Sequence, residues 1–120
     1  MTTIQRSKTK QLGQVRPTDA FPVELYSPTN RDRCVIHNII VCNNSSSSAT
    51  YQIFVDEDGT TADPPTAIAY DIALPGNTTD VWELEIYMND PAGRLSVATS
   101  SGVGNALTFT ANGEDGSIAY

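Results

Sequence analysis

Apolar and polar residues alternate most regularly in the segment from Trp82 to Met88. Every second residue there is apolar, and the residues between them are two glutamates and a tyrosine. A period of two is typical of a β-strand that turns one face to a core and the other to water. A second half-buried strand is predicted where Tyr51, Ile53 and Val55 alternate with Thr50, Gln52 and Asp56, and it ends in the turn at Asp58-Gly59.

The segment from Cys34 to Asn43 is apolar on both faces of a predicted strand. One face would carry Cys34, Ile36, Ile40 and Cys42, and the other would carry Val35, Ile39 and Val41. A strand with two apolar faces is usually covered on both sides. We therefore expect this strand at the centre of a sheet.

Further strand signals recur at short intervals, separated by clusters of Pro, Gly, Asn and Ser. They predict strands over residues 23–27, 67–74, 94–100 and 107–111, and the tail to Tyr120 could add an edge strand. No segment has the period of an amphipathic helix. The pattern predicts an all-β fold: a single β-sandwich of about seven to eight antiparallel strands, with jelly-roll connections as one option. The expected core residues are Ile36, Ile40, Ile53, Val55, Trp82, Leu84, Ile86, Leu95, Val97, Leu107 and Phe109.

Charge divides the chain into two parts. Six of the seven basic residues lie in the first 33 positions, which carry a net charge of +3, whereas residues 34–120 contain one base and eleven acids, a net charge of −10. Residues 1–20 also lack any apolar period. We therefore expect an extended basic arm over residues 1–20 and an acidic sandwich domain over residues 21–120. Removing the arm is expected to leave the sandwich folded.

Membrane insertion and disulfide formation within the chain are not expected. No run approaches the roughly 18 apolar residues of a membrane span, and no apolar stretch follows the charged N-terminus. Cys34 and Cys42 are eight residues apart in one predicted strand, about 26 Å at ~3.3 Å per residue, which is too far for a bond between them. We expect two buried thiols, with an intermolecular disulfide or a reactive thiol as the alternative.

Residue patterns that support catalysis are sparse. His37 is the one histidine and lies in the most hydrophobic predicted strand, where a hydrogen-bonded structural role is more common than catalysis. The sequence has no Gly-x-Ser-x-Gly motif, no Gly-rich phosphate loop with a lysine, and no cysteine spacing typical of zinc. We expect no catalytic residues, no cofactor and no metal.

Three weaker alternatives concern acidic and aromatic side chains. The turn at residues 56–60 (DEDGT), with Asp63 nearby, could offer oxygen ligands to calcium, although such turns are more often structural. Glu83 and Glu85, about 7 Å apart on one strand face, could form a glycosidase pair, but a solvated face explains them better. The aromatic residues are spread over separate strands, which favours packing over a sugar-binding row. They are Tyr26, Tyr51, Tyr70, Tyr87, Tyr120 and Trp82.

The basic residues of the arm are candidate partner-binding residues. They are Arg6, Lys8, Lys10 and Arg16. Binding to nucleic acid is disfavoured because no aromatic residues are interleaved with these charges and because the acidic domain repels phosphate. An acidic protein neighbour, including a second copy of this chain, fits both parts of the molecule.

Several strand-and-turn segments resemble small virion structural proteins of tailed bacteriophages. The segments are 39–43 (IIVCN), 56–61 (DEDGTT), 66–71 (TAIAYD), 93–100 (GRLSVATS) and 107–110 (LTFT), preceded by 12–14 (LGQ), 16–17 (RP) and 25–28 (LYSP). The likeness covers most of the chain, and its motifs carry no catalytic chemistry.

The resemblance implies a non-enzymatic structural protein of the virion, made in the host cytoplasm. Within that class it favours a capsid decoration, or cement, protein that binds the major capsid protein at capsomer junctions on the outer surface and stabilises the shell. The resemblance further implies a homo-oligomer, with a trimer favoured, whose arm contacts neighbouring subunits. A tail, vertex-fibre or adaptor component of the virion is the first alternative, and a carbohydrate-binding attachment module is the second.

Overall fold

The computed structural model describes residues 9–18, 21–28, 34–56, 64–88, 93–99 and 106–115. These residues form eight β-strands and one short 3-10 helix. In chain order they are β1 (Thr9–Val15), β2 (Val23–Tyr26), β3 (Cys34–Asn43), β4 (Ala49–Asp56), η1 (Pro64–Thr66), β5 (Ala67–Leu74), β6 (Thr78–Tyr87), β7 (Arg94–Thr99) and β8 (Leu107–Asp115). The all-β prediction is confirmed, and seven of these strands overlap the predicted segments.

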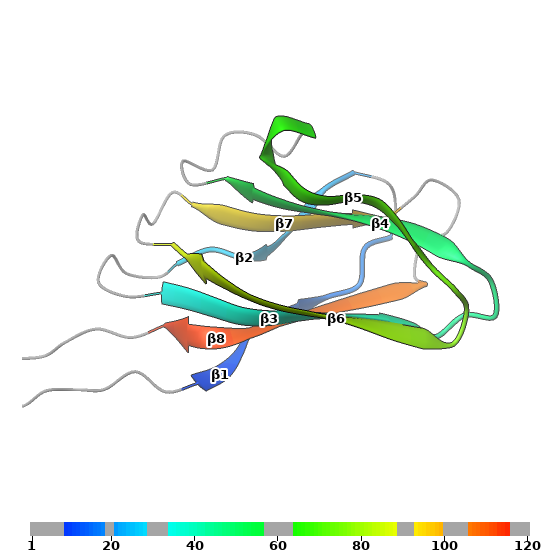
Figure 1. Ribbon diagram of the computed structural model, residues 1–120, viewed down its shortest axis with the longest axis horizontal. Helices are drawn as coiled ribbons and strands as arrows, with labels where there is room; N and C mark the ends of the chain where they lie inside the picture. Colours follow the sequence, from blue (N-terminus) through cyan, green and yellow to red (C-terminus); the bar gives the residue numbers. More distant parts are fainter. Residues whose placement is uncertain are drawn as a thin grey trace, which may run out of the picture.

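The strands form two stacked four-stranded sheets (Figure 1). Sheet A has the order β1-β8-β3-β6, and sheet B has the order β2-β7-β4-β5. All neighbours are antiparallel. In each of the pairs β1/β8, β2/β7, β3/β6 and β4/β5, a strand from the first half of the chain lies beside one from the second half. The chain is thus a long antiparallel ribbon rolled into two layers, which is the eight-stranded jelly roll.

Strand β1 corrects the prediction of an arm over residues 1–20. Thr9–Val15 pairs with β8 along its whole length, from Thr9 opposite Glu114 to Val15 opposite Phe109. A shift in register between Gln11 and Gly13 places Leu12 and Val15, three residues apart, against the core. The period of two is therefore absent from this strand, and the hydrophobic pattern did not reveal it. Residues 1–8 lie outside the described residues.

The core fills the space between the two sheets and contains most of the predicted residues. Ile36, Ile53, Leu95, Val97, Leu107 and Phe109 are fully buried, and Val55, Trp82, Leu84 and Ile86 are partly buried and pack against them. The rings of Tyr51 and Phe109 meet edge to face at 5.9 Å between centroids, which joins sheet B to sheet A.

A bulge in β3 changes which residues face the core. Between Ile36 and Asn38 the register with β8 shifts by one residue, so His37 and Asn38 both turn outward. Beyond the bulge Ile39 and Val41 point into the core, with no exposed surface. The assignment of Ile40 to the core was therefore wrong, because a single inserted residue inverts the alternation of every side chain that follows.

Buried polar side chains fix the end of the sandwich and the position of β6. Asn43 has no exposed surface, donates to the carbonyl oxygens of Ser47 (2.8 Å) and Leu74 (3.1 Å), and accepts from the backbone N–H of Ser45 (3.0 Å). Trp82 on β6 donates its indole N–H to the Tyr51 hydroxyl (2.7 Å), and this hydroxyl donates to Asp80 (2.7 Å). These contacts hold neighbouring loops together and tie β6 to sheet B.

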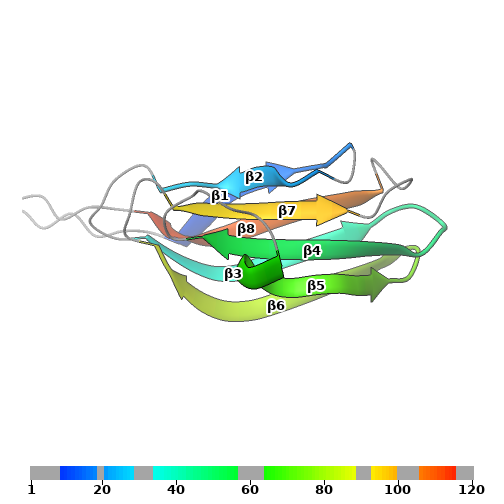
Figure 2. The ribbon, with the colours of Figure 1, turned by 90° about the horizontal axis from the view of Figure 1, so that it is seen from above.

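The two long sides of the sandwich are the β1–β2 edge and the β5–β6 edge, which lie on opposite sides in Figure 2. At the β1–β2 edge the backbones of the two sheets approach closely. A Cβ atom added to Gly13 would lie 2.1 Å from the carbonyl oxygen of Leu25. Only glycine allows this approach. The β5–β6 edge is formed by the outermost strands of the other side.

Candidate functional site

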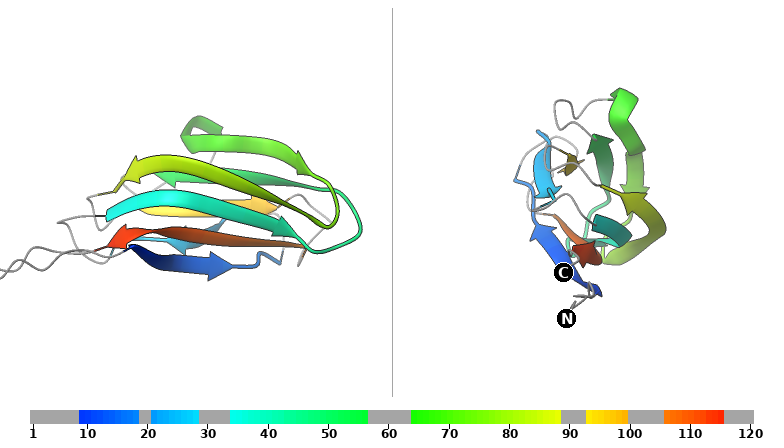
Figure 3. Two further views of the ribbon diagram at one scale, coloured as in Figure 1. Left: turned by 60° about the horizontal axis from the view of Figure 1, so that its bottom comes forward. Right: turned by 90° about the vertical axis from the view of Figure 1, so that its left-hand side faces the viewer.

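Exposed apolar side chains and carboxylates occur together on the outer face of sheet A. Strands β6, β3, β8 and β1 run side by side across it (Figure 3, left). From Thr79 to Tyr87 the side chains of β6 alternate between exposed and half-buried, and the sequence pattern predicted this alternation from Trp82 onward. The exposed set on β6 consists of Thr79, Val81, Glu83, Glu85 and Tyr87.

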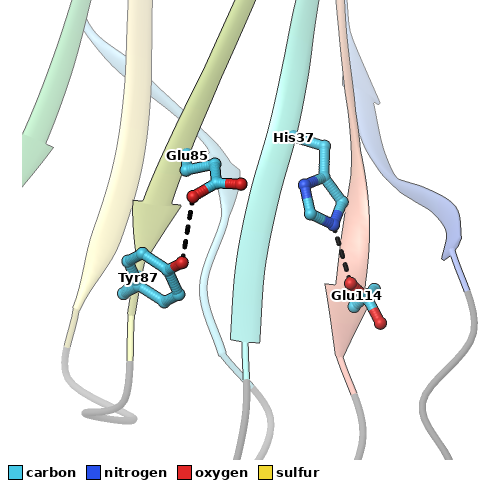
Figure 4. Close-up of polar contacts among 4 residues, drawn as sticks. All are labelled: His37, Glu85, Tyr87 and Glu114. Carbon is cyan, nitrogen blue, oxygen red and sulfur yellow. Dashed lines mark hydrogen bonds and ion pairs between the residues drawn. The ribbon is translucent and has the colours of Figure 1, made fainter.

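Two carboxylates on this face are held by contacts with neighbouring side chains (Figure 4). His37 on β3 contacts Glu114 on β8, with 2.7 Å between Nε2 and Oε2. Tyr87 donates its hydroxyl to Glu85 on the same strand (3.0 Å), and this hydrogen bond raises the pKa of Tyr87 above its ordinary value. His37 is therefore hydrogen-bonded, as expected, but it lies on the outer face of a central strand.

Exposed apolar side chains are concentrated on the β5–β6 edge. On β6, Val81 is 59% exposed and Tyr87 is 65% exposed, and on β5, Ile68 and Tyr70 are 45% and 47% exposed. Among the described strands, these are the large hydrophobic side chains with high exposure. Clusters of exposed apolar side chains on a soluble domain are typical of interaction surfaces.

The exposed charged side chains of the β5–β6 edge are all acidic. Glu83 and Glu85 on β6 and Asp71 on β5 are exposed, and neither strand contains a lysine or an arginine. Asp71 accepts a hydrogen bond from Gln52 (2.8 Å), whereas Glu83 makes no ion pair in the described part of the chain. This edge offers carboxylates and apolar surface to a partner.

The structure does not bring the described basic residues of the predicted arm into one patch. Lys10 is exposed on β1. Arg16 follows the end of β1 and donates to the Asn44 side chain (2.9 Å), so it contacts the loop between β3 and β4 of its own chain. Arg6 and Lys8 lie outside the described residues.

Little in the described ranges indicates a metal-binding site or a reactive thiol. Within them no three His, Cys, Asp or Glu side chains come together to hold a metal ion. Most of the proposed calcium turn, residues 57–63, falls outside these ranges. Cys34 is buried and donates to the Tyr26 hydroxyl (3.2 Å), Cys42 is partly exposed, and both thiols are free.

In the described part of the chain, no helix is long and apolar enough to cross a membrane.

The aromatic residues do not form a single row among the described residues. Tyr26 and Tyr51 are buried in the core, Trp82 is half-buried, and Tyr70 packs edge to face on Phe54 at 6.4 Å between ring centroids. Tyr87 stands on the outer face of sheet A, and Tyr120 lies outside the described ranges. A flat aromatic platform for a sugar ring is therefore not present among these residues.

Comparison with known proteins finds distant similarity to solved structures. No protein-family model matches the chain, and no curated protein sequence matches it. One similar solved structure is that of the infectious bursal disease virus Gx strain, with a TM-score of 0.49 and 13% identity over 98% of this chain and 40% of that chain. Another is the crystal structure of the T13 IBDV viral particle, with a TM-score of 0.48 and 13% identity over 98% of this chain and 37% of that chain. The chain spans less than half the length of both matched chains, and likeness of this degree does not establish a shared function.

Proposed function

We propose that this chain is a non-enzymatic structural protein of a virion, and specifically a decoration protein on the outer capsid surface. The observation that carries the proposal is the strand order, β1-β8-β3-β6 against β2-β7-β4-β5. This jelly roll is a recurrent building block of viral shells, although it also occurs in lectins and enzymes. The sequence resemblance to small phage virion proteins favours the first of these uses.

The distribution of charge and apolar surface supports a role in assembly. The β5–β6 edge presents exposed apolar side chains and carboxylates, and the basic residues are concentrated near the N-terminus. Such complementary patches allow each copy to contact its neighbours. On a repeating lattice, many weak contacts add up to firm binding through multivalency. The proposed partners are the major capsid protein and further copies of this chain, with a trimer as the favoured oligomer.

The number of copies per particle tests the proposal. Quantitative mass spectrometry of purified particles would compare this chain with the major capsid protein. We expect copies in numbers comparable to the capsomers, because a decoration protein occupies every equivalent surface site. A few copies per particle would instead indicate a tail, vertex-fibre or adaptor component. Absence from particles, together with glycan binding by the isolated chain, would indicate an attachment module.

Particle stability gives a second test. Particles that lack the protein are expected to release their genome at a lower temperature than complete particles, because bound decoration stabilises the assembled shell by mass action. Adding the purified protein back should restore the release temperature. Equal release temperatures with and without the protein would contradict a stabilising role.

A further inference from the structure

We propose that residues 1–8 of a second copy of this chain add to the free edge of β6 as an antiparallel strand. In this arrangement Lys8 lies opposite Glu83, Arg6 lies opposite Glu85, and Ile4 lies opposite Tyr87. The inference rests on the proposed function, because it specifies how neighbouring copies of an assembly protein are joined. Sheet A thereby gains a fifth strand that belongs to another copy.

Strand β6 is a suitable acceptor because it has a strand partner on one side only. It pairs with β3, and no described strand pairs with its other side. An edge strand presents unpaired N–H and C=O groups, which proteins commonly protect with lysine, proline or a shortened strand. The ten residues of β6 contain no lysine, proline or glycine. The backbone of β6 is thus open to strand addition.

Strand β5, the other strand of this edge, is a poorer acceptor. Its register with β4 shifts twice within a few residues, whereas the register of β6 with β3 shifts once, between Glu83 and Ile86. Asp71 also has a positive φ of 51°, a conformation that interrupts an extended strand. Bulges of this kind protect an edge from pairing. With one register shift and no non-glycine residue of positive φ, β6 is therefore the better acceptor of the two strands.

The spacing of charges matches between the two segments. Glu83 and Glu85 are two residues apart and share the outer face of β6. Arg6 and Lys8 are also two residues apart, so in an extended conformation they share one face. Side chains directly opposite each other on paired strands have Cβ atoms about 4.5–5.5 Å apart, which is within reach of an ion pair. Ile4, on the same face of the arm, meets the exposed ring of Tyr87.

Charge also disfavours a symmetric alternative in which two copies pair through their β6 strands. Such a pairing would bring the glutamates of the two outer faces close together, and like charges on neighbouring positions of paired strands are destabilising. Six of the seven basic residues lie in the first 33 positions, and Arg6 and Lys8 are the two that precede β1. The complementary partner for β6 is therefore the N-terminal segment.

The geometry of sheet A requires that this segment comes from another copy. Thr9, Glu114, Val35 and Tyr87 lie in one row across the four strands. A strand added outside β6 would lie four strand spacings from β1, about 19 Å away. Lys8 is bonded to Thr9, and consecutive Cα atoms are only about 3.8 Å apart. Lys8 of the same chain cannot reach a position opposite Glu83, so the donor is a second copy.

The test is an exchange of charges between the two segments, with self-association of the full chain measured by sedimentation velocity at low ionic strength. Lys8→Glu alone and Glu83→Lys alone are each expected to weaken association about tenfold or more. The double variant with both changes is expected to recover most of the wild-type affinity. Lys10→Glu is the matched control, because it makes the same change of charge within β1 and is expected to have a smaller effect.

Three results would overturn the inference. They are a wild-type chain that stays monomeric up to about 1 mM, a double variant no better than the single variants, and rescue of Lys8→Glu by Glu85→Lys in preference to Glu83→Lys. Circular dichroism and thermal unfolding check that each variant is folded. The number of copies per particle is independent of these results, so failure of strand addition is distinguishable from failure of the proposed virion role.

Discussion

The two long edges of the sandwich are built differently. At the β1–β2 edge the strands have only seven and four residues, the backbones approach at Gly13, and no large apolar side chain of the two strands is highly exposed. At the β5–β6 edge four large apolar side chains are exposed beside three carboxylates, and β6 is ten residues long. The first edge is closed by its own chain. The second retains surface and backbone groups that a partner can cover.

The difference indicates where stability and assembly are encoded. Residues at the β1–β2 edge and in the core are expected to set the stability of the monomer. Exposed residues of the β5–β6 edge are expected to set self-association and to contribute little to folding, since surface substitutions usually change stability by less than about 0.5 kcal/mol. Measurements on single variants can separate these two contributions.

Deletion of residues 1–16 is expected to have the largest effect, a loss of about 2–4 kcal/mol in the free energy of unfolding. It removes Leu12 and Val15 from their contacts with the core and leaves β8 without its outer neighbour. Deletion of residues 1–8 is the control, and it should preserve stability because β1 begins at Thr9. Urea denaturation measures both, and equal stability of the two shortened chains would contradict an integral role for β1.

Gly13→Ala is expected to lower the free energy of unfolding by about 1–3 kcal/mol, because the added methyl group forces the backbones of β1 and β2 apart. Ala73→Val adds two methyl groups on β5, where Ala73 is exposed, and is expected to change stability by less than about 0.5 kcal/mol. Thermal or chemical unfolding of the two variants compares the edges directly. A similar cost at both positions would mean that the edges do not differ in packing.

Tyr51→Phe is expected to cost about 1–2 kcal/mol, since it removes the hydroxyl that joins Trp82 to Asp80 and leaves the indole N–H without this acceptor. Burial, followed by the hydrogen bond to Asp80, raises the pKa of Tyr51 above its ordinary value of 10.0. The unfolded chain therefore releases this proton at lower pH than the folded chain, so the contribution to stability is complete below pH 10.0 and is lost as the pH rises through the folded-state pKa.

The pH dependence of unfolding checks this assignment. The wild-type chain should lose stability above pH 10.0, and this loss should be smaller in Tyr51→Phe, which has no proton to release at this position. An identical alkaline loss of stability in both chains would show that Tyr51 is not responsible. Self-association of Tyr51→Phe also tests whether the hydrogen bonds from β6 to Tyr51 in sheet B are needed for association.

Val81→Thr is expected to have the smallest effect on folding, less than about 0.5 kcal/mol, because Val81 is mostly exposed and threonine is also β-branched. It should still weaken self-association, since it replaces apolar surface on β6 with a hydroxyl. Unfolding and sedimentation measurements on the same sample separate the two effects. A large loss of stability would place Val81 in the core of the monomer and remove the distinction between the two edges.

Regular hydrophobic alternation made much of the fold predictable from the sequence. The bounds of β3 and β5 agree with the predicted segments, and the all-β class followed from the turn residues between strands. Bulges caused the two main errors. The bulge in β1 removed the period of two, and the bulge in β3 exchanged the faces of Ile39 and Ile40. A bulge depends on pairing with a neighbouring strand, which a single-sequence pattern does not contain.

The candidate surface was predictable only in part. The alternation of Glu83 and Glu85 with apolar residues correctly placed the two glutamates on a wet face. The sequence did not reveal that Val81 belongs to the same face, because the polar residues at 78–80 concealed the beginning of β6. It also did not reveal that β6 is an edge strand. Strand order results from packing between segments far apart in the chain, which local patterns do not encode.

Zero-length cross-linking of a mixed sample tests most directly the claim that copies join through β6. Equal amounts of chain labelled with ¹⁴N and ¹⁵N would be mixed, allowed to exchange, and treated with a carbodiimide that links lysine amines to carboxylates in contact. We predict a linked peptide pair containing Lys8 and Glu83 in which half of the pairs carry both labels. A Lys8–Glu83 link found only within one label, or links from Lys8 exclusively to other carboxylates, would contradict the account.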